Sequence, residues 1–95
     1  MKYPEAILIR FLEKAGNDDR LLPSHISLFT SVYYLLRKTG GENEVKISRK
    51  KLMPLAKISS ISTYHRCMSE LVALGYIIYE PSYNYYIGSK IVFNT

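Results

Sequence analysis

Hydrophobic residues recur at helical spacing through the first forty residues, and this pattern predicts two helices. Pro4 suits the first turn of a helix because its ring fixes φ and its missing N–H is not needed there. Gly16 can end this helix in a left-handed conformation. The core-facing residues of this first helix are expected to be Ile7, Leu8, Phe11, Leu12 and Ala15.

We expect the second helix to run from Ser24, as N-cap, to Thr39, where the glycine pair at 40–41 stops it. Its inward stripe is Leu28 or Phe29 with Val32, Leu35 and Leu36, and Tyr33 at its edge.

Residues 45–56 predict a short strand followed by a short helix. Val45–Ile47 alternates between apolar and polar side chains, as a half-buried strand does. Ser48 is then placed to cap a helix over Arg49–Ala56. Because Pro54 falls inside this helix, we expect it to be short or distorted. Its inward residues are expected to be Leu52, Leu55 and Ala56.

The clearest helical pattern lies between residues 60 and 74. After a turn at 57–59, either Ser59 or Ser60 can serve as N-cap, and Gly75 is expected directly after the last residue, Leu74. At ~100° per residue, one face of this helix is apolar: Tyr64, Cys67, Met68, Leu71 and Leu74. The opposite face is small and polar: Ser62, Arg66, Ser69 and Ala73, flanked by Thr63 and His65.

The pattern changes after Gly75, because residues 76–79 are β-branched and aromatic, as strands prefer. A turn-rich loop over 81–86 separates them from a second predicted strand over 87–93. Two strands joined by a loop, directly after two helices and a turn, form the wing of a winged helix. We therefore predict an α+β winged helix-turn-helix, with three to four helices, a small antiparallel β-sheet and a C-terminal β-hairpin wing.

The composition fits one such domain. Ninety-five residues leave no room for a second core, so we expect a single domain over 1–95, with 24–93 as the winged-helix core and 1–16 as an N-terminal helical extension. No apolar run is long enough to span a bilayer, and the N-terminus lacks the pattern of a secretory signal. The single cysteine, Cys67, cannot form an internal disulfide, which favours the reducing cytoplasm.

The formal net charge of +5 is concentrated in one segment of the chain. Between Val45 and Ser69 there is no acid and there are six basic residues: Lys46, Arg49, Lys50, Lys51, Lys57 and Arg66. The rest of the chain holds the other seven basic residues against all eight acids. The whole positive excess therefore lies where a surface that meets phosphate is expected. The plain alternative is a solvated basic face.

Charge and pattern together predict contacts with duplex DNA. The helix expected in the major groove supplies Ser60, Ser62, Thr63, His65, Arg66 and Ser69. Of these, Arg66 can make the bidentate contact to guanine. The expected phosphate contacts are Arg49, Lys50, Lys51 and Lys57. In the wing we expect Tyr83, Asn84, Tyr85 and Lys90 to face DNA. For Tyr83, Tyr85 and Tyr86, stacking on single-stranded bases stays open as a second interpretation.

The stretch Leu52–Ile77, LMPLAKISSISTYHRCMSELVALGYI, resembles the winged helix-turn-helix of bacterial transcription regulators. Residues 48–84 are more similar still to small DNA-binding proteins of mobile elements in Bacteroides-type bacteria. The resemblance implies that Ser62, Thr63, His65 and Arg66 face the groove and that the loop over 81–86 is the wing. The chain departs from the pattern in two places: the turn at 57–59 has no glycine, and the wing tip has no Arg or Lys.

The sequence offers no constellation for catalysis. His65 and Cys67 lie two residues apart on a helix and so point in different directions, and His25 lies far away at the start of the second helix. Cys67 is interpreted as a small core residue. Because paired carboxylates, a phosphate-binding glycine loop and metal-ligand clusters are missing, we expect no enzyme activity, metal, cofactor or small-molecule ligand.

The leading hypothesis is a cytoplasmic, sequence-specific DNA-binding protein, either a transcriptional regulator or a recombination or excision accessory factor. A homodimer is expected because one such module buries limited area on DNA, and the helix over 4–15 is its candidate interface. The alternative from another class is a winged-helix module that binds a partner protein without DNA. A third hypothesis, the DNA-binding part of a replication initiator, fits the short chain less well.

Overall fold

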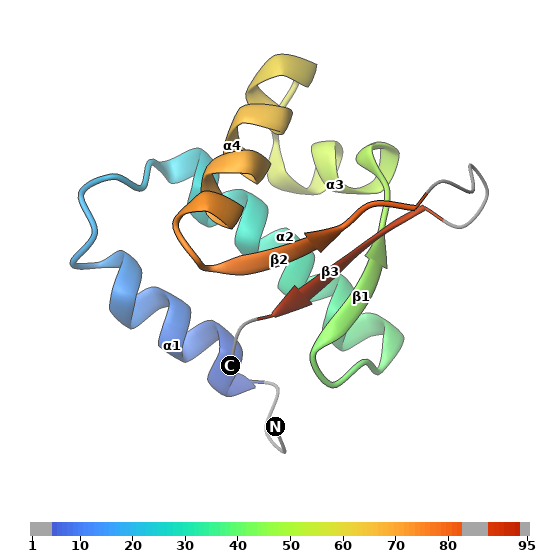
Figure 1. Ribbon diagram of the computed structural model, residues 1–95, viewed down its shortest axis with the longest axis horizontal. Helices are drawn as coiled ribbons and strands as arrows, with labels where there is room; N and C mark the ends of the chain where they lie inside the picture. The colour runs from blue at the N-terminus through green and yellow to red at the C-terminus, as the bar shows by residue number, and fades with distance from the viewer. Residues whose placement is uncertain (1–4, 83–87, 94–95) are drawn as a thin grey trace.

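The computed structural model describes residues 5–82 and 88–93, and within them four helices and three strands form an α+β fold (Figure 1). In chain order these elements are α1 (Glu5–Ala15), α2 (Pro23–Thr39), β1 (Glu44–Ile47), α3 (Arg49–Ala56), α4 (Ile61–Ala73), β2 (Ile77–Glu80) and β3 (Ser89–Phe93). The predicted order of elements and the α+β class are confirmed. None of the described helices is long and apolar enough to cross a membrane.

The start of α2 differs from the prediction. Ser24 is not the N-cap, because Pro23 occupies the first helical position and Leu22 is the capping residue. Leu22 has no polar side chain, and its backbone N–H instead donates to Nδ1 of His25 at 2.8 Å. The far end is as predicted: Gly40 has φ +75°, a left-handed conformation that glycine adopts without strain.

α3 has the predicted bounds and cap. The hydroxyl oxygen of Ser48 accepts from the backbone N–H of Lys51, and Pro54 lies inside the eight-residue helix without ending it. α3 ends at Ala56, and its C-cap, Lys57, has φ +59°. A glycine is the usual residue in this conformation, so Lys57 takes the place of the glycine that the turn lacks.

The three strands form one antiparallel sheet in the order β1-β3-β2 (Figure 1). Val45 is paired with Ile91, and Ile77 with Phe93, so the buried residues of all three strands lie on one face. β2 begins one residue later than predicted, at Ile77. The predicted start of the last strand, Ile87, lies outside the described residues, as do Pro4 and most of the predicted wing loop.

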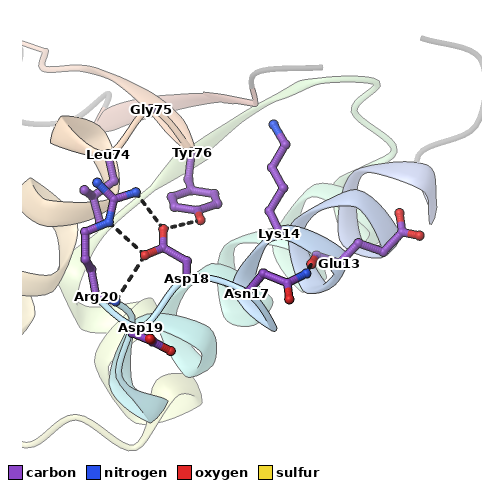
Figure 2. Close-up of a pocket in the computed structure, with 9 residues that line it drawn as sticks. All are labelled: Glu13, Lys14, Asn17, Asp18, Asp19, Arg20, Leu74, Gly75 and Tyr76. Atoms are coloured by element: carbon purple, nitrogen blue, oxygen red, sulfur yellow. Dashed lines mark hydrogen bonds and ion pairs between the residues drawn. The ribbon is translucent and has the colours of Figure 1, made fainter.

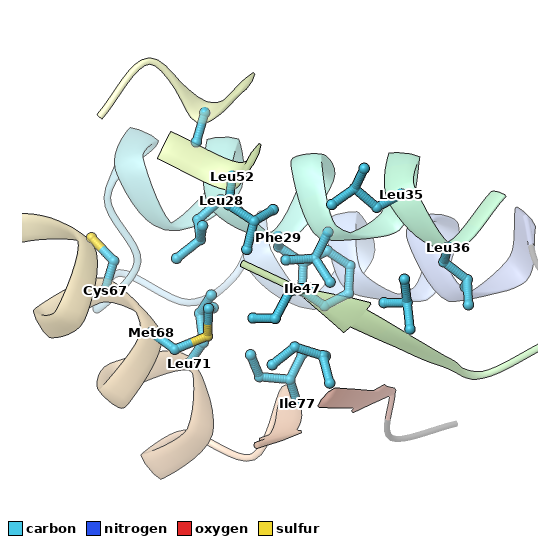
Figure 3. Packing of buried hydrophobic residues seen from close by; sticks show 14 of the residues in the cluster. Leu28, Phe29, Leu35, Leu36, Ile47, Leu52, Cys67, Met68, Leu71 and Ile77 are labelled. Atoms are coloured by element: carbon cyan, nitrogen blue, oxygen red, sulfur yellow. The ribbon is translucent and has the colours of Figure 1, made fainter. Parts of the chain in front are cut away.

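One hydrophobic cluster joins the helices to the inner face of the sheet (Figure 3). α1 belongs to it, because Phe11 stacks on Phe29 of α2 with ring centroids 3.7 Å apart and meets the edge of Tyr76 at 5.3 Å. Phe29 in turn meets the edge of Phe93 at 5.2 Å. The largest fully buried side chains in the cluster are Leu28, Leu36, Leu52, Leu71, Ile77 and Ile91.

Three predicted core residues do not belong to the hydrophobic cluster or to the partly buried side chains packed against it. Leu12 is 47% exposed, because α1 meets the core through Ile7 and Phe11 and Leu12 points about 100° away from Phe11 around the helix. Leu55 is 44% exposed for the same reason, since it is adjacent to buried Ala56. Leu74 is only partly buried, because it is the C-cap of α4 rather than part of its last turn.

A hydrogen-bonded cluster of polar side chains connects the α1–α2 loop to the start of β2 (Figure 2). The carboxylate of Asp18 accepts from Nε and Nη2 of Arg20, each at 2.8 Å, and from the hydroxyl of Tyr76 at 2.6 Å. These hydrogen bonds, first of all the one from Arg20, hold the pKa of Asp18 well below its usual range. Burial, followed by the hydrogen bond to Asp18, raises the pKa of Tyr76 to about 12.

We expect Asp18→Asn to lower the melting temperature near neutral pH by more than the neighbouring exposed control Asp19→Asn. Because the pKa of Asp18 is depressed in the folded state, its contribution is fully present above the usual carboxyl pKa of 3.8 and is lost as the pH falls below it. The difference between wild type and Asp18→Asn should therefore shrink on acidification. Thermal unfolding, monitored by circular dichroism at several pH values, measures this difference in melting temperature. A difference independent of pH would contradict the role assigned to the ionised Asp18 carboxylate.

Candidate functional site

α4 separates its side chains into a buried and an exposed face, as predicted. Tyr64, Cys67, Met68 and Leu71 are buried in the hydrophobic cluster. The exposed side carries Ser62, His65, Arg66 and Ser69, and Thr63 is half-buried. Burial of one side therefore orients these four predicted groove-facing residues outward, and a fifth, Ser60, is exposed just before the helix.

Ser60 rather than Ser59 is the N-cap of α4. Its hydroxyl oxygen accepts from the backbone N–H of Thr63 at 3.3 Å and lies 2.9 Å from the hydroxyl oxygen of Ser62. The Ser60 side chain therefore has a structural role at the first turn, and both serines are exposed.

The basic residues before α4 are exposed. Arg49, Lys50 and Lys51 form the first turn of α3, and Lys57 lies in the turn between α3 and α4. Among the described residues, none of these four has a carboxylate within ion-pairing distance; the six ion pairs found lie elsewhere. Their positive charge is therefore uncompensated by local contacts.

The charge of Arg49 reaches α4. Burial raises the pKa of the Tyr64 phenol to about 12, Tyr79 adds to the increase, and the positive charge of Arg49 opposes it. The first turn of α3 is therefore close enough to the buried side of α4 for Arg49 to act on Tyr64.

Arg66 is not isolated on this face. Its Nη1 lies 3.5 Å from Oε1 of Glu70, one turn further along α4. The same oxygen lies 2.8 Å from Nε2 of His25, a side chain of α2 that is 1% exposed. Sequence reasoning missed both His25 and Glu70. The i,i+4 spacing of Arg66 and Glu70 is a visible signal, whereas the contact with His25 spans 45 residues.

Lys90 lies on the central strand β3, between the carboxylates of both neighbouring strands. Its Nζ is 3.3 Å from Glu80 of β2 and 3.4 Å from Glu44 of β1. The hydrogen bond to Glu80 and the charge of Glu44 raise the pKa of the Lys90 ammonium. The charge of this predicted wing residue is thus largely compensated. The other three wing residues, Tyr83, Asn84 and Tyr85, lie outside the described residues.

A groove of about 330 Å³ runs along α4 where it meets β2, and sequence reasoning did not find it. Six residues line it: Tyr64, His65, Met68, Ser69, Val72 and Tyr79. Val72 and Tyr79 are 37% and 38% exposed, so the groove carries apolar surface next to the polar face. The hydroxyl groups of Tyr79 and Ser89 are hydrogen-bonded at 2.7 Å.

Cys67 is fully buried and its thiol donates to the hydroxyl oxygen of Ser24 at 3.3 Å. It therefore packs as a core residue, as predicted, while His65 points outward. Within residues 5–82 and 88–93, no three His, Cys, Asp or Glu side chains gather in a way that could hold a metal ion.

Comparisons with protein families, curated proteins and solved structures find no match to this chain.

We expect Tyr64→Phe to raise the pH at which the protein unfolds in alkali. A phenol whose pKa is raised to about 12 in the folded state contributes stability below its usual pKa of 10, and this stability is lost as the pH rises toward 12. Phenylalanine removes the ionisation and keeps the packed ring. Far-ultraviolet circular dichroism against pH measures the midpoint, with Tyr34→Phe, on a ring that is 48% exposed, as the matched control. An equal midpoint for wild type and Tyr64→Phe would contradict the prediction.

Proposed function

We propose that the chain is a winged-helix protein that binds duplex DNA with α4 in the major groove. One observation carries this proposal: α4 has an exposed, small and polar face, and the helix and turn directly before it in the chain expose four basic residues whose charge no described carboxylate compensates. In this architecture α3 and α4 are the helix-turn-helix and the β2–β3 pair supports the wing.

The exposed face of α4 suits a major groove, which is about 12 Å wide and admits one helix. Ser62 and Ser69 are small, so they allow the helix backbone to approach the bases, and their hydroxyls can donate to or accept from base edges. Arg66 lies between them on the same face and has the guanidinium fork that fits O6 and N7 of guanine. We therefore assign base contact to Arg66 and close approach to the serines.

The basic residues of α3 suit the DNA backbone. In a helix-turn-helix the first helix crosses the phosphates while the second occupies the groove. Arg49, Lys50 and Lys51 repel the positive end of the α3 dipole, and a bound phosphate would relieve that repulsion. We assign Lys57, which is exposed in the turn, to a phosphate beside the N-terminus of α4. We expect Lys90 to contribute less to DNA binding than these basic residues, because two carboxylates already flank its ammonium group.

The groove beside α4 supports a second candidate function, binding to a partner protein. Exposed apolar side chains next to a polar face are typical of protein interfaces, and Val72 and Tyr79 supply them here. Under this reading the face of Ser62, Arg66 and Ser69 packs against protein, and the affinity depends weakly on salt concentration. DNA binding is preferred because four exposed basic residues without an ion pair, Arg49, Lys50, Lys51 and Lys57, directly precede α4 in the chain.

The salt dependence of binding tests the proposed function. We expect fluorescence anisotropy with a random duplex of about 25 base pairs to show binding whose log affinity falls linearly with log salt concentration between roughly 50 and 200 mM. Lys50→Ala should weaken binding to all sequences and flatten the slope by about one unit. Lys14→Ala, the loss of an exposed lysine on α1, is the matched control and should leave the slope unchanged. The absence of binding at low salt would favour the partner-protein alternative.

We further propose that two copies bind one site through α1. Ile9 is 56% exposed and Leu12 is 47% exposed on the side of α1 that turns away from the core. Deleting α1 would not test this, because the deletion also removes Phe11 from the core, and losing one buried Phe side chain costs ~3–5 kcal/mol. A point substitution on the exposed side is therefore the proper test.

We expect Ile9→Glu to convert a dimer into a monomer with little change in melting temperature. A carboxylate at the centre of a buried apolar contact would be desolvated without a partner, which disfavours association. Sedimentation velocity over a range of protein concentrations measures the mass, and Ile78→Glu, on an isoleucine of β2 that is 43% exposed, is the matched control. A wild-type mass of one chain at all concentrations would contradict the proposed dimer.

A further inference from the structure

We propose that Glu70, held in place by the buried His25, determines the base specificity of the α4 face by positioning Arg66 and by opposing contact with phosphate. This inference rests on the proposed function, because it assigns a role to a residue within the DNA-contacting surface. Three observations lead to it: the hydrogen-bonded state of His25, the position of the Glu70 carboxylate, and the distribution of charge on α4.

The two ring nitrogens of His25 have different, fixed roles. The backbone amide of Leu22 can only donate, so Nδ1, at 2.8 Å from it, must accept. The ring proton is therefore on Nε2, which donates to Oε1 of Glu70 at 2.8 Å. Because the ring of His25 is buried and its other nitrogen caps α2, it cannot turn without losing both hydrogen bonds. His25 thus presents a rigid donor to Glu70 from the core side of α4.

Glu70 in turn restricts Arg66. The carboxylate oxygen bound by His25 is also the one that lies 3.5 Å from Nη1 of Arg66. A guanidinium has five N–H donors, so Arg66 can stay beside Glu70 while other donors on its fork reach a guanine edge. Arg66 is 48% exposed, which leaves that part of the side chain accessible. Holding a long side chain in place before binding reduces the entropy lost when the contact forms.

The charge of Glu70 also discriminates against contact with the backbone. Glu70 is the single acid in α4, on a helix whose exposed face meets DNA in the proposed complex. If Arg66 left Glu70 to pair with a phosphate, the carboxylate would face the negatively charged backbone without its partner. A bidentate contact to guanine, by contrast, keeps the pair together. Glu70 therefore weakens binding to unrelated sequences more than binding to the correct site, which is how repulsive elements produce specificity.

Two substitutions separate these effects. Glu70→Gln keeps an oxygen to accept from His25 but removes the negative charge. We therefore expect tighter binding to random duplex. We also expect the preference for one base at the position that Arg66 contacts to fall by roughly tenfold. His25→Asn keeps an oxygen that can accept from the Leu22 amide but removes the donor to Glu70. We expect it to reduce the same base preference while leaving the affinity for random duplex unchanged, because no carboxylate is lost.

The experiment is selection of bound sequences from a random duplex library, followed by anisotropy with a selected site and with random duplex. Arg66→Ala identifies the base pair that Arg66 contacts, because preference is lost at that position. Glu13→Gln, which makes the same change of charge on an exposed residue of α1, is the matched control and should leave the preference unchanged. The melting temperature of each variant shows whether it folds.

A reduced preference at the Arg66 base pair in both Glu70→Gln and His25→Asn supports the proposal. An unchanged preference in these variants, while wild type selects a site, overturns it and leaves the proposed function intact. Wild type that binds duplex without any base preference also overturns it. Wild type that binds no duplex overturns the proposed function, and this inference with it.

Discussion

The packing of one side of α4 against the hydrophobic cluster is the constraint on which the candidate site depends. Tyr64, Cys67, Met68 and Leu71 can be buried only if the helix is rotated so that Ser62, Arg66 and Ser69 point to solvent. Burying one such apolar side chain contributes ~1.5–3 kcal/mol, whereas an exposed ion pair contributes less than about 1 kcal/mol. Burial in the core therefore fixes the rotation of α4 about its axis. The polar contacts of Arg66 form within that orientation and do not determine it.

Most of the fold follows from local patterns. Amphipathic spacing identifies all four helices, Ser48 marks the start of α3, and Gly75 directly after the C-cap of α4 has the left-handed conformation expected there. The errors have local physical causes. Pro23 can begin a helix, which displaces the expected cap at Ser24, and an apolar residue such as Leu12 or Leu55 is buried only if another element covers its side of the helix. Apolar periodicity alone does not show how wide the covered face will be.

The candidate site was predictable to a smaller extent. The outward residues of α4 and the basic residues of α3 follow from periodicity and charge along the chain, and both are exposed as expected. The contact of His25 with Glu70 joins α2 to α4 across 45 residues and depends on how those helices pack, which no local pattern encodes. The carboxylates beside Lys90 likewise come from two strands that become its neighbours only when the sheet forms.

The strand order has a consequence for how the molecule assembles. β3 lies between β1 and β2, so the segment containing α3, α4 and β2 is enclosed in a long loop that closes when β1 pairs with β3. The amide of Phe93 also donates to the carbonyl of Asn43, which tightens this closure. Contacts between segments so distant in sequence form slowly, because the entropy of closing the loop is lost first. During synthesis on the ribosome, the sheet that supports α4 is therefore incomplete until the chain has been translated through Phe93 and has emerged.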